Sequence, residues 1–238
     1  MFKHRSEQKE LMDDLTLSNE ELGRNLDDIE FCNKLFGSNR ALLDSLNKIL
    51  DKYPTHLKNK KIIVADLGCG SGDQILIMQR WAASHQINIH IIGIDANPYM
   101  IQHANKKLHT ANNIEYKVMN IFSPEFAQMQ FDIITINSVC HHFNDDTLAK
   151  FFTQLAKQAR LAVIFNDLQR HWLSYHGIKI IAKLLHFSYL TQADAPLSVL
   201  RAFRKKELIA ILNQAQVNLY QIRWAYAFRW VIIIWCKN

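Results

Sequence analysis

The stretch Asp66-Leu67-Gly68-Cys69-Gly70-Ser71-Gly72-Asp73 decides the fold, and it follows the apolar run Ile62-Ile63-Val64-Ala65. A short continuous apolar run that ends in a turn is typical of a strand covered on both faces. Three glycines at alternate positions let the backbone pass close to a ligand, with N–H groups and the start of a helix facing it. The stretch therefore predicts a strand, a ligand-binding loop and a helix in succession.

The spacing of the glycines, G-x-G-x-G, differs from that of the common phosphate loops. The dinucleotide fingerprint G-x-G-x-x-G requires a third glycine where this chain has Asp73, and the Lys-Ser/Thr pair of a P-loop is missing from the sequence. The carboxylates of Asp66 and Asp73 would repel a pyrophosphate. They suit a ligand that carries an ammonium and a sulfonium group.

A second motif ends the next apolar segment, Ile92-Gly93-Ile94-Asp95-Ala96-Asn97. An acidic residue at the tip of a second strand can accept hydrogen bonds from both hydroxyls of a ribose. The alternative for Asp95 is an N-cap for the helix that Pro98 opens. The separation between this motif and the glycine loop favours the ribose.

Strand and helix patterns alternate along most of the chain, which implies right-handed βαβ units and a parallel sheet. A capping box at Ser18 and Glu21 opens a first helix, and Gly37-Ser38 ends it. The next helix stops at Tyr53-Pro54-Thr55. The further helices that we expect are 41–50, 74–84, 98–109, 145–159, 177–190 and 205–214. The strands that we expect are 62–65, 87–94, 114–119, 131–136 and 161–165.

Residues 217–237 predict two strands that meet near 225–228, an antiparallel hairpin at the sheet edge. The expected fold class is α/β: a Rossmann-like, doubly wound, mostly parallel seven-stranded sheet with an antiparallel C-terminal edge hairpin and N-terminal helices. We expect an N-terminal helical cap at 1–58, and a main domain at 59–238 with a helical insertion at about 168–200.

Length and composition exclude several classes of protein. The chain has 238 residues, 49% hydrophobic and 21% charged, which predicts a packed core and excludes global disorder. A formal net charge of +6 favours an anionic partner such as nucleic acid, lipid headgroups or an acidic metabolite. The basic residues are scattered, however, and the densest run, 201–206, fits the solvated start of a helix.

The four cysteines lie far apart and form no C-x-x-C pair. This spacing predicts free thiols in a reducing compartment and no zinc site, and we expect no metal. The N-terminal residues are charged and have no apolar centre, unlike a signal peptide, and the apolar run 231–236 is too short to span a bilayer. We therefore expect a cytoplasmic protein without a transmembrane segment.

On the two motifs, the sequence resembles the class I S-adenosylmethionine (SAM)-dependent methyltransferases, closely over about residues 60–166. The whole chain is similar to bacterial small-molecule methyltransferases with an N-terminal helical cap. The resemblance implies SAM as cofactor, with Asp66 beside the methionine ammonium and Asp95 on the ribose. The other cofactor contacts that it implies are Gly68, Cys69, Gly70 and Gly72 around the methionine part, Ala96, Asn97, Met100, Asn120 and Ile121 around the adenine, and Asn137 near the transferring methyl.

Asn120 stands where the family often has aspartate, and its amide oxygen can accept the same bond from the adenine amine. The loop Asn137-Ser138-Val139-Cys140-His141-His142-Phe143 lacks the Asn/Asp-Pro-Pro-aromatic tetrad of enzymes that methylate amino groups of DNA bases. That class of substrate is therefore disfavoured.

Three histidines are candidates for a general base that takes a proton from an oxygen nucleophile, because an imidazole titrates near neutrality. His141 and His142 follow the fourth strand, and His171 follows the fifth, at the sheet edge where ligands bind. The alternative for each is a loop histidine bonded to backbone.

Substrate contacts are predicted from charge and aromatic content. Arg170 and Arg201 could hold an acidic or phenolate group, or serve as ordinary ion-pairing arginines. Trp172 and Tyr175 could wall an aromatic pocket or belong to the core. The segment 177–187 is either a helix packed on the sheet, a lid over a hydrophobic acceptor, or a shallow membrane contact.

The function that we expect is methyl transfer from SAM to a small, aromatic or hydrophobic hydroxylated metabolite, with O-methylation favoured over C-methylation. RNA methylation and a non-catalytic protein that keeps the fold are the alternatives. The expected partner is a small-molecule acceptor; nucleic acid is disfavoured, and the oligomeric state stays open.

Overall fold

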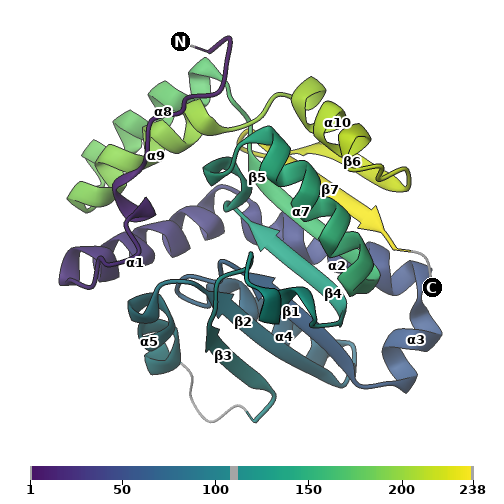
Figure 1. Ribbon diagram of the computed structural model, residues 1–238. Coiled ribbons are helices and arrows are strands. Elements are labelled where there is room, and N and C mark those ends of the chain that lie inside the picture. The colour runs from purple at the N-terminus through teal and green to yellow at the C-terminus, as the bar shows by residue number, and fades with distance from the viewer. Residues whose placement is uncertain (1, 108–111, 237–238) are drawn as a thin grey trace.

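The computed structural model describes residues 2–107 and 112–236, which form one seven-stranded sheet between layers of helices (Figure 1). The strands are β1 (Ile62–Leu67), β2 (Ile89–Asp95), β3 (Ile114–Val118), β4 (Phe131–Asn137), β5 (Ala159–Leu168), β6 (Tyr220–Ala225) and β7 (Arg229–Trp235). Their order is β3-β2-β1-β4-β5-β7-β6. The strands β1 to β5 are parallel, and β7 is antiparallel to β5 and β6. The predicted fold class is confirmed.

Helices cover both faces of the sheet and one end of it (Figure 1). One face packs against α2 (Ser38–Lys52), α4 (Asp73–Ser84) and α5 (Pro98–Lys107). The other face packs against α6 (Pro124–Ala127), α7 (Asp145–Gln158) and α10 (Lys205–Gln214). The remaining helical elements are η1 (Leu11–Asp13), α1 (Glu20–Leu35), α3 (Pro54–Asn59), η2 (Cys140–His142), α8 (Trp172–Leu184) and α9 (Tyr189–Arg201).

The apolar run in β1 is continuous because both of its faces are buried. Val64 packs in the core that contains Leu46 of α2, whereas its neighbour Ala65 packs in the core that contains Phe152 of α7. Successive side chains of a strand point to opposite faces of the sheet. A strand between two helical layers is therefore apolar on both faces, because neither face is exposed to solvent.

A crevice opens where the winding of the sheet reverses. The chain leaves β1 for α4 on one face and leaves the neighbouring strand β4 for α7 on the other. Ligands of open α/β sheets bind outside the carboxyl ends of the strands at such a switch point. The glycine loop after β1 and the histidine loop after β4 therefore face the same space.

Several predicted boundaries differ from the structure. Asn19, rather than Ser18, caps α1, because its side-chain oxygen accepts a hydrogen bond from Leu22 N at 3.0 Å. The second helix does stop at Tyr53, as predicted, and Pro54 then begins the short helix α3, because proline fits the first turn of a helix. The predicted helix over 98–109 is described only as far as Lys107; positions 108 and 109 lie outside the described residues, as does position 237 of the hairpin.

The single helix predicted over 177–190 is wrong, because two helices occupy this region. The first, α8, begins at Trp172 and ends at Leu184. His186 then adopts a left-handed φ of 52°, which breaks the helix. Ser188 caps α9 by accepting a hydrogen bond from Thr191 N at 3.1 Å. The two helices pack as a pair over the carboxyl ends of the strands.

Within residues 2–107 and 112–236, no helix combines the length and the apolar character that crossing a bilayer requires.

Candidate active site

A cavity of about 760 Å³ lies at the carboxyl ends of the parallel strands. The loops after β1, β2 and β4 form one side of it, and the N-terminal segment, α1, α8, α9 and the β6–β7 turn close the others. In Figure 1, α1 and the α8–α9 pair lie on the side toward which the arrow of β4 points. Much of the lining is apolar, and the ionisable groups include Asp66 and Asp95 after β1 and β2 and His141 and His142 after β4.

The glycine loop at one end has a backbone that glycine adopts most readily. Gly68 and Gly72 have φ angles of 67° and 73°. A Cβ atom added to Gly68 would lie 2.4 Å from Val139 Cγ2, and one added to Gly72 would lie 2.2 Å from Tyr116 Oη. The glycines therefore allow the loop to pass between β3 and the loop after β4.

The loop amides do not face a ligand in the way the sequence predicts. The N–H groups of Gly68 and Cys69 both donate to Ile94 O, at 2.8 and 3.1 Å. Gly70 N donates to Asp95 Oδ2 at 3.1 Å. These three donors hold the loop against the end of β2 and are not free for a diphosphate, so carboxylates dominate this end of the cavity.

Asp66 is the innermost of these carboxylates. It is buried, and Thr135 Oγ1 on the neighbouring strand β4 donates to Asp66 Oδ1 at 2.6 Å. Burial raises the pKa of Asp66 to about 7, and the nearby Asp73 and Asp95 act in the same direction, against the hydrogen bond from Thr135. A cation bound beside Asp66 would stabilise its charged form.

Asp95 ends β2 and faces the cavity. Besides the bond from Gly70, its Oδ1 accepts from Asn97 N at 2.9 Å. Burial raises the pKa of Asp95, and these backbone hydrogen bonds oppose the shift. The predicted cofactor residues that line the cavity are Asp66, Gly68, Cys69, Gly70, Asp95, Ala96, Met100, Asn120, Ile121 and Asn137.

Two predicted cofactor residues have structural positions instead. Gly72 is the N-cap of α4. The Asn97 side chain donates to Leu17 O at 3.0 Å and accepts from Tyr99 N at 2.8 Å, so it joins the N-terminal segment to the start of α5. Neither is among the residues that line the cavity.

The opposite end of the cavity holds the paired histidines of η2. His141 Nδ1 lies 2.7 Å from Asp167 Oδ1, and His142 Nδ1 lies 2.5 Å from Asp13 Oδ1. Burial would raise the pKa of Asp167, but His141 and backbone hydrogen bonds hold it below its usual value. Hydrogen bonds from His142 and Arg201 likewise outweigh burial and lower the pKa of Asp13.

Both carboxylates are therefore acceptors, and each Nδ1 carries the hydrogen. The Nε2 atom of a neutral imidazole is then left with a lone pair. The two rings lie 4.3 Å apart between centroids, and both line the cavity. His141 and His142 are thus held by carboxylates rather than by backbone carbonyls, and each can accept a proton at Nε2.

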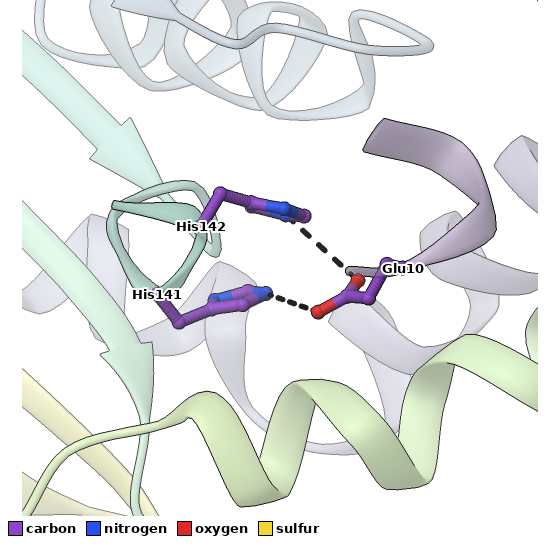
Figure 2. A group of neighbouring side chains, drawn as sticks. All are labelled: Glu10, His141 and His142. Carbon is purple, nitrogen blue, oxygen red and sulfur yellow. Dashed lines mark ion pairs between the residues drawn. The ribbon is translucent and has the colours of Figure 1, made fainter. Parts of the chain in front are cut away.

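Glu10 faces both histidines across this end of the cavity (Figure 2). Its Oε1 lies 3.6 Å from His141 Nε2, and its Oε2 lies 3.9 Å from His142 Nε2. The side chain is fully buried, and among the described residues neither carboxylate oxygen has a hydrogen-bond partner. Burial raises the pKa of Glu10 to about 7, against the opposing effects of His142 and Arg201.

The four residues predicted to touch the substrate are not among those lining the cavity. Arg170 is buried elsewhere and pairs with Glu207 at 2.5 Å. Arg201 supports the histidine loop, since it donates to the carbonyl oxygens of His141 and His142 and to Asp13. Trp172 is exposed on α8, and Tyr175 packs edge-on against Phe2.

His171 is also absent from the lining and caps α8. Its Nδ1 accepts a hydrogen bond from Leu173 N at 3.2 Å, and its ring stacks on Phe228 at 4.7 Å. We expect His171→Ala to lower the free energy of unfolding by about 1 kcal/mol, as loss of an N-cap does, and to leave turnover within about threefold. Urea unfolding and initial rates check this; a large loss of turnover at unchanged SAM affinity would make His171 the base.

Several polar residues of the site were missed in the sequence. Asn33 of α1 donates to Asp73 Oδ2 at 3.1 Å, and Arg229 lines the cavity beside Asn137. Glu10 and Asp13 come from a polar N-terminal segment that carries no recognisable motif. The position of Asp167, two residues after the predicted fifth strand, was the one signal that could have identified a partner for a histidine.

Comparison with known proteins agrees with this geometry. Residues 64–160 match the family described as "Methyltransferase domain". Carboxy-S-adenosyl-L-methionine synthase of Helicobacter pylori (strain HPAG1) is 25% identical over 126 residues, which are 52% of this chain and 46% of that protein. The chain thus matches less than half the length of these curated relatives.

Solved structures show the same fold at low identity. The plantazolicin methyltransferase BpumL, bound to a triazolic substrate analogue and S-adenosylhomocysteine (SAH), has a TM-score of 0.67 at 12% identity, covering 90% of this chain and 91% of that one. Human N-acetylserotonin methyltransferase in complex with SAM has a TM-score of 0.62 at 13% identity, covering 93% and 57%. Residues 64–160 thus resemble a methyltransferase domain, and the chain shares the fold of these methyltransferases.

Proposed function

We propose that the chain transfers the methyl group of SAM to a small hydrophobic acceptor, at the oxygen of a hydroxyl on an aromatic or quinone-like ring. The observation that carries the proposal is the continuity of the cavity. One space of about 760 Å³ connects the glycine loop and Asp95 at one end with His141 and His142 at the other. A cofactor at the first end and an acceptor at the second would meet inside it.

The residues at the first end fit SAM. Asp66 and Asp95 supply carboxylates for the methionine ammonium and the ribose hydroxyls, and Met100 and Ile121 supply apolar contacts for the adenine. The positions that a Cβ would fill at Gly68 and Gly72 are already taken by Val139 and Tyr116, so the loop cannot carry larger residues without moving. A diphosphate would instead meet buried carboxylates.

When bound, SAM supplies a methyl group on a sulfonium that already has a good leaving group, so the protein needs mainly to align the acceptor and exclude water. The apolar residues of α1 and α8 in the cavity wall suit a hydrophobic ring. His142 accepts the proton of the acceptor hydroxyl at Nε2, while Asp13 holds the ring through Nδ1. Asp167 orients His141 in the same way.

Arg229 suits the role that the sequence assigned to Arg170 or Arg201, the binding of an acidic or phenolate group. It is buried in the cavity wall, and its Nε and Nη2 donate to Asn166, Asn137 and Ser138. No carboxylate of the described residues lies within 4 Å of its guanidinium. Burial lowers the pKa of Arg229 to about 10, so it stays charged at neutral pH.

Calorimetry with SAM and with SAH tests the proposal first. A folded protein that binds neither SAM nor SAH would be a non-catalytic protein that keeps the fold.

Mass spectrometry of the product distinguishes C-methylation of the acceptor ring from O-methylation, because the two products give different fragments. If the chain methylates RNA, it should retain total RNA on filters, and this retention should weaken as the salt concentration rises. A protein that shows no such salt-sensitive RNA binding excludes this alternative.

The pH dependence of SAM binding should follow the ionisation of the Asp66 carboxyl group. Because its pKa is raised to about 7, the free protein holds a proton there at pH 6, and an ammonium bound beside it displaces that proton. We expect SAM affinity to fall about tenfold from pH 8 to pH 6, with proton release on binding at pH 6. Calorimetry in two buffers of different ionisation enthalpy measures both, and Asp66→Asn should remove the dependence. Equal affinity and no proton release at both pH values would contradict this placement.

A further inference from the structure

Three potential metal ligands meet at the histidine end of the cavity. One ligand atom each from Glu10, His141 and His142 lies within 4.8 Å of the others. The atoms that face one another are the carboxylate oxygens and the two Nε2 atoms, as Figure 2 shows. Two imidazoles and one carboxylate are a common donor set for first-row divalent metals.

The distances do not fit direct hydrogen bonds. At 3.6 and 3.9 Å, the contacts of Glu10 with His141 and His142 exceed the usual N–H···O range. Asp167 and Asp13 hold the two Nδ1 hydrogens, so each imidazole in its neutral form presents an Nε2 lone pair toward the carboxylate of Glu10. Facing acceptor atoms of this kind are held together by a proton or a cation between them. Ligand atoms on one tetrahedral ion lie about 3.4 Å apart, so the three side chains, whose ligand atoms lie within 4.8 Å of one another, would draw together around an ion.

The local charge also favours a cation. The carboxylates of Glu10, Asp13, Asp167 and Asp194 surround the pair of histidines, and Arg201 approaches Glu10 at 3.6 Å. The nearby Arg5 is engaged by Asp145. Of these four acidic groups, Glu10 and Asp13 pair with Arg201, and Asp167 lies near Arg229. Glu10 is fully buried and has no hydrogen-bond partner among the described residues, so the contact with Arg201 at 3.6 Å compensates its charge only in part.

From this arrangement we infer that Glu10, His141 and His142 bind one divalent first-row transition-metal ion, with Zn²⁺ as the representative ion. Asp167 and Asp13 then act as outer carboxylates that orient the two imidazoles, the arrangement that metal-binding histidines usually have. This site contrasts with the expectation of no metal, which rested on the spacing of the cysteines. Spacing along the chain does not detect ligands contributed by two distant segments.

The site has room for a further ligand on its cavity side, since all three residues line the cavity. A hydroxyl that binds there would have its pKa lowered by the ion and would release its proton to bulk water. In the metal-loaded protein the two imidazoles would then serve as ligands, and the role of His142 as a base belongs to the metal-free protein. Metal binding itself does not depend on the proposed methyl transfer, so the two can succeed or fail separately.

The test uses the full chain with any affinity tag removed, stripped with chelator and titrated with Co²⁺ and Zn²⁺. We expect about one equivalent of Co²⁺ to give visible d–d absorption, and Zn²⁺ to displace it. Glu10→Gln and His142→Asn should each weaken binding at least 100-fold, whereas Asp13→Asn should weaken it about 10- to 100-fold. Glu7→Gln, an exposed glutamate in the same segment, is the matched control and should bind as the parent does.

Two results would overturn the inference. One is a folded parent protein that takes up no stoichiometric Co²⁺ or Zn²⁺, which would mean that protons or water fill the space between the three side chains. The other is unchanged binding in folded Glu10→Gln, which would place the metal elsewhere. Circular dichroism of each variant establishes folding, and the titration of the parent decides the matter even if a variant does not fold.

Discussion

The Asp95→Ala variant is expected to bind SAM about 30-fold more weakly than the parent. In the proposed complex the carboxylate accepts hydrogen bonds from both ribose hydroxyls, and loss of such a charge-assisted pair costs about 2 kcal/mol. Asp95 lies at the tip of β2 and faces the cavity, so no other carboxylate at that strand end can replace it. Calorimetry at pH 8 measures the change.

Asp95 also has a structural role that the experiment must separate. It accepts hydrogen bonds from Gly70 N and Asn97 N, so the alanine variant leaves two amides without an acceptor, and we expect its melting temperature to fall. Asp95→Asn keeps an acceptor oxygen without the charge and should fall between the two proteins in affinity. Asp51→Ala, an exposed position in α2, is the control. Unchanged SAM affinity in folded Asp95→Ala would show that the ribose does not bind at β2.

His142→Asn is expected to reduce kcat about 100-fold while SAM affinity stays within about twofold. The imidazole is held by Asp13 with Nε2 toward the acceptor, and removing a positioned acid–base group typically costs 100- to 10,000-fold. The glycine loop, at the other end of the cavity, keeps its contacts. SAH release with a panel of phenolic acceptors measures kcat, and calorimetry measures SAM binding.

Two further variants separate a role of His142 in the reaction from a nonspecific effect of substituting a histidine. Asp13→Asn should lower kcat less than His142→Asn does, because Asp13 acts by positioning the ring. His85→Asn should have full activity, since His85 ends α4 and is not among the residues lining the cavity. Full turnover of His142→Asn across pH would exclude this residue from the reaction, and loss of SAM binding would indicate disturbed structure instead.

The parts of the fold that follow from local patterns were predictable. The apolar run of β1, the glycine loop and α4 are consecutive, and their hydrogen bonds and φ angles depend on neighbouring residues. Asp95 was predictable for a related reason, because parallel strands bring consecutive strand ends to one edge. The break between α8 and α9 was missed because the apolar pattern continues through Leu185, while the backbone turns at His186.

The sequence alone thus determined the class of fold and the position of the glycine loop and Asp95 at the carboxyl ends of β1 and β2, because both lie in contiguous strand–loop–helix units. Only the tertiary structure decided the composition of the histidine end. His142 and Asp13 are 129 residues apart in the chain, and His141 and Asp167 are 26 apart. No periodicity links such positions. His141 and Asp167 meet because β4 and β5 are neighbours in the sheet, and His142 and Asp13 meet because the N-terminal segment packs against the loop after β4.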